Sequence, residues 1–250
     1  DGGDGGDGGD VIVAGGRAKG LNVNDNAGDV EVRGGEAYSG YGGNVKITAG
    51  AGTSTSSGSI VMRTANAGLG GISGSVTIKT GTTSVGDSGR VTILTGQAES
   101  GAGGSMRLSV GQGDSGEGGY VSISAGQTTD ALGASGGYVS IRTGYSHVTS
   151  SGPFMLRTSN SGSNGVSGEI SLSTGTTANG NSGSFSIATG TAVSGRGGDF
   201  NLRVGTGNSG DGGDVLMFAG ESTQAGQAGG NTVISGGEGS SISDKDGGDG

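Results

Sequence analysis

Residues 76–81 read Val76-Thr77-Ile78-Lys79-Thr80-Gly81, and residues 91–96 follow the same pattern as Val91-Thr92-Ile93-Leu94-Thr95-Gly96. Apolar residues stand at the first and third positions, and mostly polar residues stand between them. This alternation is typical of a β-strand, because successive side chains of an extended chain point to opposite faces. The glycine-rich stretches between the motifs disfavour helix, since an interior glycine costs about 1 kcal/mol relative to alanine. The pattern therefore predicts short strands separated by glycine loops.

The motif recurs along the chain with a regular period, and each occurrence with its following loop is called a repeat below. The first apolar residue falls at positions 30, 45, 60, 76, 91, 106, 121, 139, 154, 170, 185, 200 and 215, mostly in steps of 15 or 16 residues. A second period of 94 residues lies above the first, so that residues 44–137 recur as residues 138–231. Arg63-Thr64, for example, returns as Arg157-Thr158. Internal periods of this kind are the sequence signature of repeat architectures.

Each repeat has only two or three residues suited to a core, so no repeat is expected to fold alone. Stacking repeats in register would align the apolar residues in continuous columns. We therefore predict an all-β fold, a parallel β-solenoid (β-helix) with roughly 15-residue rungs, formed by residues 11–237. A flattened coil with two 15-residue repeats per turn remains an alternative arrangement. An antiparallel stack of hairpins is the third arrangement considered. In the solenoid, parallel ladders would bury the apolar pairs of four repeats: Val76, Ile78, Val91, Ile93, Val121, Ile123, Val139 and Ile141.

Composition limits the classes to which the chain can belong. Of its 250 residues 65 are glycine, one is proline and none is cysteine, which argues against collagen and removes disulfides and thiolate metal sites. The net charge of −9 argues against nucleic-acid binding, which needs clustered Lys and Arg. No apolar run approaches the roughly 18 residues that span a membrane. The Asp/Gly-rich segments 1–10 and 238–250 are interpreted as linkers or ends, and the chain as a mature product or part of something longer.

Candidate chemistry is sparse. His147, the only histidine, lies in a loop without a catalytic partner set, and the chain is not expected to be an enzyme. Asp199 and Asp214 occupy the same place before consecutive motifs, with Asp211 nearby. In a coil with one repeat per turn they would stack about 4.8 Å apart. Splayed side chains, Arg196 or a bound calcium ion would have to offset their repulsion. Asp199, Asp211 and Asp214 are thus the candidate metal ligands, and no other cofactor is expected.

Across its length the chain resembles, in style, the Gly/Ser/Thr-rich tandem-repeat β-solenoid proteins of algal and protist cell surfaces and appendages. The resemblance rests on short units of the type Val139-Ser140-Ile141-Arg142-Thr143-Gly144 and on Ser-Gly-Gly segments. It implies a surface coat, an adhesive or an appendage shaft, without catalytic residues. We expect an extracellular or cell-surface structural protein, a rod-like building block of a fibre, appendage or surface layer. It would associate with itself end to end or laterally, with polysaccharide as a possible partner. A cell-surface adhesin or glycan-binding stalk is the alternative; ice binding fits less well, because the outward positions are too mixed.

Overall fold

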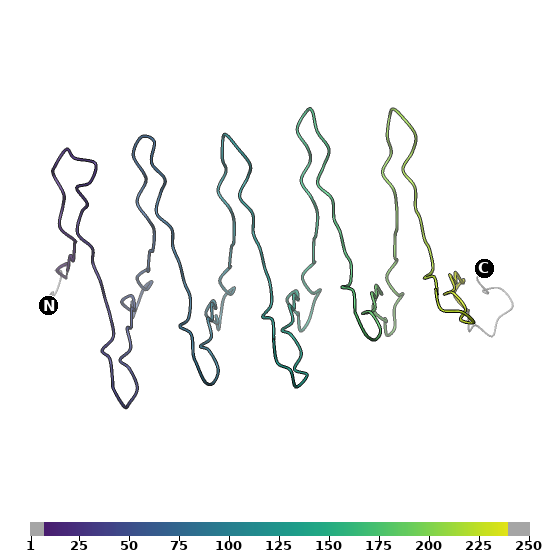
Figure 1. Ribbon diagram of the computed structural model, residues 1–250, viewed down its shortest axis with the longest axis horizontal. Coiled ribbons are helices and arrows are strands. Elements are labelled where there is room, and N and C mark those ends of the chain that lie inside the picture. Colours follow the sequence, from purple (N-terminus) through teal and green to yellow (C-terminus); the bar gives the residue numbers. More distant parts are fainter. Residues whose placement is uncertain (1–7, 240–250) are drawn as a thin grey trace. The chain divides into compact units, whose positions relative to one another are not determined.

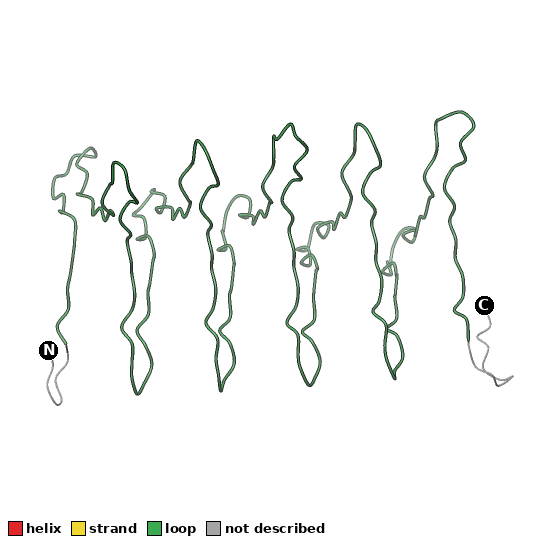
Figure 2. Ribbon diagram, turned by 90° about the horizontal axis from the view of Figure 1, so that it is seen from below, coloured by secondary structure: helices red, strands yellow, loops and turns green. Residues whose placement is uncertain are grey.

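A computed structural model describes residues 8–239, and throughout this range the backbone is coil with scattered turns and bends. None of these residues lies in a helix or a strand (Figures 1 and 2). No helix in the described range is therefore long and apolar enough to cross a membrane. The chain divides into two parts, Asp1–Ser122 and Ile123–Gly250, which are described separately here. The predicted end segments 1–10 and 238–250 lie largely outside the described residues.

Within each part, straight stretches alternate with narrow loops (Figure 1). An ion pair at residues 30–33 reports on the local backbone. Nε of Arg33 lies 3.0 Å from Oε1 of Glu31, so the side chains of residues two apart meet on one side of the chain. An extended backbone places residues i and i+2 on the same face. The alternation in the sequence is thus expressed locally, although no second strand pairs with this stretch.

Each loop narrows where it begins and ends. We number the first apolar residue of a motif as position 1 and call the glycine two residues before it the preceding glycine. A Cβ built on the preceding glycine Gly89 would lie 3.3 Å from Cγ2 of Thr80, which holds position 5 of the repeat before. This contact between position 5 and the next preceding glycine is called the neck. In four necks the preceding glycine also donates a backbone hydrogen bond of 2.8–3.0 Å to the glycine at position 6: Gly43 N to Gly35 O, Gly58 N to Gly50 O, Gly137 N to Gly126 O, and Gly152 N to Gly144 O. Similar bonds, Gly28 N to Gly16 O and Gly230 N to Gly220 O, close loops before the first repeat and after the last motif.

Local conformation recurs with the 94-residue period. Gly86 and Gly180 have φ values of 100° and 109°, in the left-handed region that favours glycine. In the same loops Thr83 Oγ1 donates a hydrogen bond to Val85 O at 2.9 Å, and Thr177 Oγ1 donates one to Asn179 O at 3.2 Å. Equivalent sequences in the two copies thus adopt equivalent loop conformations.

The predicted core does not form. No described residue is buried, and the apolar pairs that should have lined the solenoid are exposed. Val91, for example, is 51% exposed and Ile93 is 66% exposed. The prediction of a parallel β-solenoid is therefore wrong for the described residues. The two-repeat coil and the hairpin stack also fail, because both require strands and the described range contains none.

The predicted strands do not form because alternation of apolar and polar residues specifies only the face on which each side chain lies. A strand also needs a partner whose backbone completes its hydrogen bonds. A neck supplies one backbone hydrogen bond at most, so it closes a loop without starting a ladder. Burying two apolar side chains per repeat would have to offset the conformational entropy lost when about fifteen residues become ordered. That loss is large because many of these residues are glycine. The chain accordingly remains coil-like, with its apolar residues unpaired.

Candidate functional site

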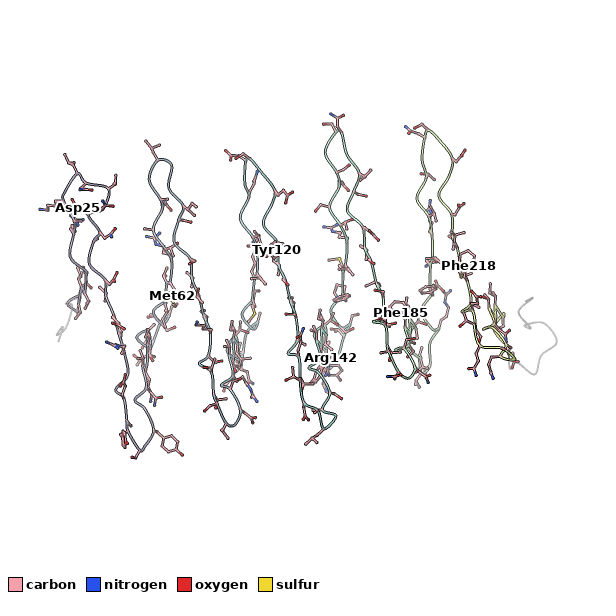
Figure 3. The ribbon with its side chains drawn as sticks, in the orientation of Figure 1. Asp25, Met62, Tyr120, Arg142, Phe185 and Phe218 are labelled. Carbon is pink, nitrogen blue, oxygen red and sulfur yellow. The ribbon has the colours of Figure 1, made fainter. Side chains whose placement is uncertain are left out.

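The most regular surface of the molecule is formed by the residues at positions 1 and 3, which we call the apolar pairs. All thirteen repeats carry Val, Ile, Leu, Met or Phe at both positions, and all 26 side chains are exposed. Two members, Met62 and Phe185, are labelled in Figure 3. Contiguous apolar patches mark interaction surfaces in folded proteins, and the apolar pairs are the residues of this chain that could form one.

Coverage within the apolar pairs is graded along each repeat. Val45 at position 1 is 49% exposed, whereas Ile47 at position 3 of the same repeat is 71% exposed. Position 5 is the best covered place in several repeats, and Ala49, Thr64, Thr80 and Ala125 are half-buried there. The neck accounts for this coverage because it brings the next preceding glycine against position 5. Each apolar pair is therefore held on an extended stretch that ends at a closed loop.

The candidate metal ligands do not come together. Asp199 Oδ1 pairs with Nη2 of Arg196, and both side chains are mostly exposed. Asp211 and Asp214 are exposed as well. Within residues 8–239 no three His, Cys, Asp or Glu side chains form a group that could hold a metal ion. Of the three ways to offset the acidic charge that the sequence suggested, the structure shows the Arg196 pair.

The loop that carries His147 has its own local order. Ser146 Oγ accepts a hydrogen bond from Thr149 N at 3.0 Å and lies 3.0 Å from Thr149 Oγ1. Ser146 is half-buried, whereas His147 is exposed, as the sequence suggested. Hydroxyl-to-backbone bonds of this kind favour turns. The hydroxyl of Ser146 thus orders the loop and leaves the imidazole to solvent.

Sequence reasoning missed the role of the preceding glycines. Glycine stands two residues before position 1 in every repeat, from Gly28 to Gly213, and this spacing was the available signal. The sequence predicted only loops rich in glycine, whereas the structure places preceding glycines such as Gly74 and Gly104 against position 5 of the repeat before. At Gly119 a Cβ would lie 2.7 Å from Cγ1 of Val110, closer than two carbon atoms can pack. Close approach therefore favours glycine at this neck, while at Gly198 a Cβ would make only ordinary packing contact.

No protein-family model matches the chain, and searches of curated proteins and of solved structures also give no match. The function is accordingly inferred from the chain's own surfaces. These are the apolar pairs, the exposed tyrosines and the polar segments of the loops.

Proposed function

We propose that the chain is a structural protein that associates with itself through its apolar pairs, as a component of an extracellular fibre, appendage or surface layer. The observation that supports this most directly is the exposure of every apolar pair on a chain that buries no described residue. Burial of apolar surface is the dominant favourable term in most protein association. A second copy of the chain carries the same apolar spacing and can therefore cover many pairs at once.

Charge sets a condition on this association. The net charge of −9 makes copies of the chain repel one another, and dissolved salt screens that repulsion. The apolar attraction does not depend on opposite charges. Association should therefore strengthen when the ionic strength is raised, which is the reverse of assembly held by ion pairs.

Sedimentation velocity over a range of protein concentrations tests the proposal. The chain should sediment as larger species as its concentration rises, and at lower concentration when salt is added. The triple variant Ile78→Ser, Ile93→Ser and Ile123→Ser removes three members of the apolar pairs. Burying each isoleucine contributes about 1.5–3 kcal/mol, so the concentration needed for association should rise more than about tenfold.

A matched variant with Thr77→Ser, Thr92→Ser and Ser122→Thr changes position 2 of the same three repeats and serves as the control. It should associate like the parent chain. If the parent sediments as a monomer at all concentrations, or if both variants behave alike, self-association through the apolar pairs is disproved.

The exposed tyrosines support a second candidate function, that of a cell-surface adhesin or glycan-binding stalk. All five tyrosines are between 86% and 106% exposed, and Tyr38 and Tyr41 share one loop. A tyrosine ring offers an apolar face and a polar tip, which suits contact with a sugar. Titration with neutral oligosaccharides should change the tyrosine fluorescence of the parent and of Tyr145→Ala, but less in Tyr38→Ala/Tyr41→Ala. No change in the parent would exclude this candidate.

A further inference from the structure

Two short segments, one in each part of the chain, form hollows whose linings differ at one residue of four. Arg63, Thr64, Ala65 and Asn66 line a hollow of about 320 Å³, and Arg157, Thr158, Ser159 and Asn160 line one of about 280 Å³. The two segments are 94 residues apart and therefore occupy the same place in the super-repeat. We call them the Arg-Asn hollows. Their recurrence shows that the shape follows from the local sequence.

The Arg-Asn hollows lie where the repeat departs from its usual pattern. Position 6 is glycine in the other repeats, as in Thr80-Gly81, but it is Ala65 in one hollow and Ser159 in the other. An asparagine follows in both segments. Both copies of the 94-residue super-repeat thus lack the usual glycine at position 6. In both, the guanidinium group of an arginine and the amide group of an asparagine lie within four residues of sequence.

The side chains of the hollows are free to bind a ligand. Neither Arg63 nor Arg157 forms an ion pair with any residue between 8 and 239. The methyl group of Thr64 takes part in the neck, where a Cβ on Gly74 would lie 3.2 Å from its Cγ2. The side-chain amides of Asn66 and Asn160 make no hydrogen bond to another described residue.

The charge around the Arg-Asn hollows differs from that of the whole chain. Residues 37–86 contain no Asp or Glu but include Lys46, Arg63 and Lys79, and residues 131–168 contain no Asp or Glu but include Arg142 and Arg157. These acid-free stretches occur in a chain of net charge −9. Salt screens charges beyond about 8 Å at physiological ionic strength, so the local sign decides what a hollow attracts.

We propose that the Arg-Asn hollows bind an oxyanion, either a free inorganic ion or a sulfate or carboxylate group of an acidic polysaccharide. The guanidinium group presents donors in a fork that matches two oxygens of such a group. The asparagine amide and the threonine hydroxyl add further donors within the same four residues. This inference does not depend on self-association, because the hollows contain no residue of an apolar pair.

Nuclear magnetic resonance with sodium sulfate as the probe tests the sites, with sodium chloride keeping the ionic strength constant. The amide signals of residues 64–66 and 158–160 should shift with saturation. Arg63→Gln should abolish the shifts at 64–66 and leave those at 158–160, which provide the internal reference. Arg142 precedes Thr143-Gly144 and lacks the asparagine, so Arg142→Gln should change neither hollow.

A second substitution separates the shape of the hollow from its charge. Ala65→Gly with Asn66→Thr restores the common pattern of Thr80-Gly81-Thr82 and keeps Arg63. The sulfate-dependent shifts at 64–66 should weaken severalfold. If residues 143–145 shift as strongly as 64–66, or if no residue shifts, the proposal is overturned, because the anion then has no preference for the hollows.

Dextran sulfate distinguishes the two sources of the anion. A polymer that reaches both hollows of one chain gains avidity, so Arg63→Gln/Arg157→Gln should weaken its binding about tenfold more than either single substitution. That result supports the polysaccharide as the source. Equal binding of the polymer by the parent and the double variant, together with sulfate-dependent shifts, supports the free ion.

Discussion

Two necks in the N-terminal part are closed in different ways. At Gly34 and Gly43 both sides of the neck are glycine, and the backbones meet through the Gly43 N to Gly35 O hydrogen bond of 2.8 Å. At Val110 and Gly119 only one side is glycine, and the side chain of Val110 fills the space that a Cβ of Gly119 would need. A neck can therefore be closed by a backbone hydrogen bond or by a side-chain contact. Position 5 alone does not decide which, because the Gly58 N to Gly50 O and Gly152 N to Gly144 O bonds form with Ala49 and Thr143 at that position.

The difference shows what the glycine-rich loops contribute. Where position 5 is glycine, as at Gly34, backbone atoms of the two sides of the loop approach each other most closely, whereas at Val110 a side chain occupies the neck. The side-chain type occurs again in the C-terminal part, where a Cβ on Gly213 would lie 2.9 Å from Cγ1 of Val204. Substitutions to alanine at the necks should therefore have graded effects.

The largest effect is expected for Gly34→Ala. The added Cβ would overlap the carbonyl oxygen of Gly43, and backbone atoms cannot move aside as a side chain can. The Gly43 N to Gly35 O hydrogen bond, which contributes about 1 kcal/mol, should be lost. Nuclear Overhauser contacts between residues 34–35 and 43 would then disappear. Gly35→Ala is the matched control because a Cβ there has open space, and retained contacts in Gly34→Ala would refute the backbone neck.

A smaller effect is expected for Gly119→Ala. The new Cβ meets Cγ1 of Val110, and the stiff valine side chain must leave its preferred rotamer at a cost of about 1 kcal/mol. Contacts between residues 110 and 119 should weaken and return in Gly119→Ala/Val110→Ala, since alanine at position 110 removes the clash. Gly118→Ala, with open space around its Cβ, provides the control. A neck that stays open in the double variant would contradict this explanation.

The threonine necks should tolerate alanine best. A Cβ on Gly89 would lie 3.3 Å from Cγ2 of Thr80, and one on Gly198 would lie 3.8 Å from the same atom of Thr189. The first contact needs a shift of a few tenths of an ångström, and the second is ordinary packing. Overhauser intensities across the neck should fall slightly in Gly89→Ala and remain unchanged in Gly198→Ala. A larger loss of intensity in Gly198→Ala than in Gly89→Ala would show that the distance between the added Cβ and the threonine methyl group does not control closure of the neck.

The fold could not be predicted from the sequence, because the predicted strands do not form in the described residues. At residues 30–33 the ion pair of Glu31 with Arg33 agrees with side chains two residues apart lying on one side of the chain. The same alternation gave no information on pairing, so it predicted for Val91 and Ile93 a core that the described residues do not form. A periodic sequence specifies identical local conformations whether or not the repeats stack. The Arg-Asn hollows could have been suspected from Ala65 and Ser159, the two residues that replace glycine at position 6.

The smallest effect is expected when calcium is added, because the candidate ligands are not assembled. Calcium takes six to eight oxygen ligands, and Asp199 is paired with Arg196, whose positive charge opposes a nearby cation. At fixed ionic strength the carboxyl carbon signals of Asp199, Asp211 and Asp214 should shift no further than that of Asp87, the one carboxylate residue between 37 and 98. Arg196→Gln should raise the response of Asp199 slightly by removing its partner. A saturating shift confined to the three aspartates of the parent chain would instead establish calcium binding, and it would show that the ion displaces Arg196 from Asp199.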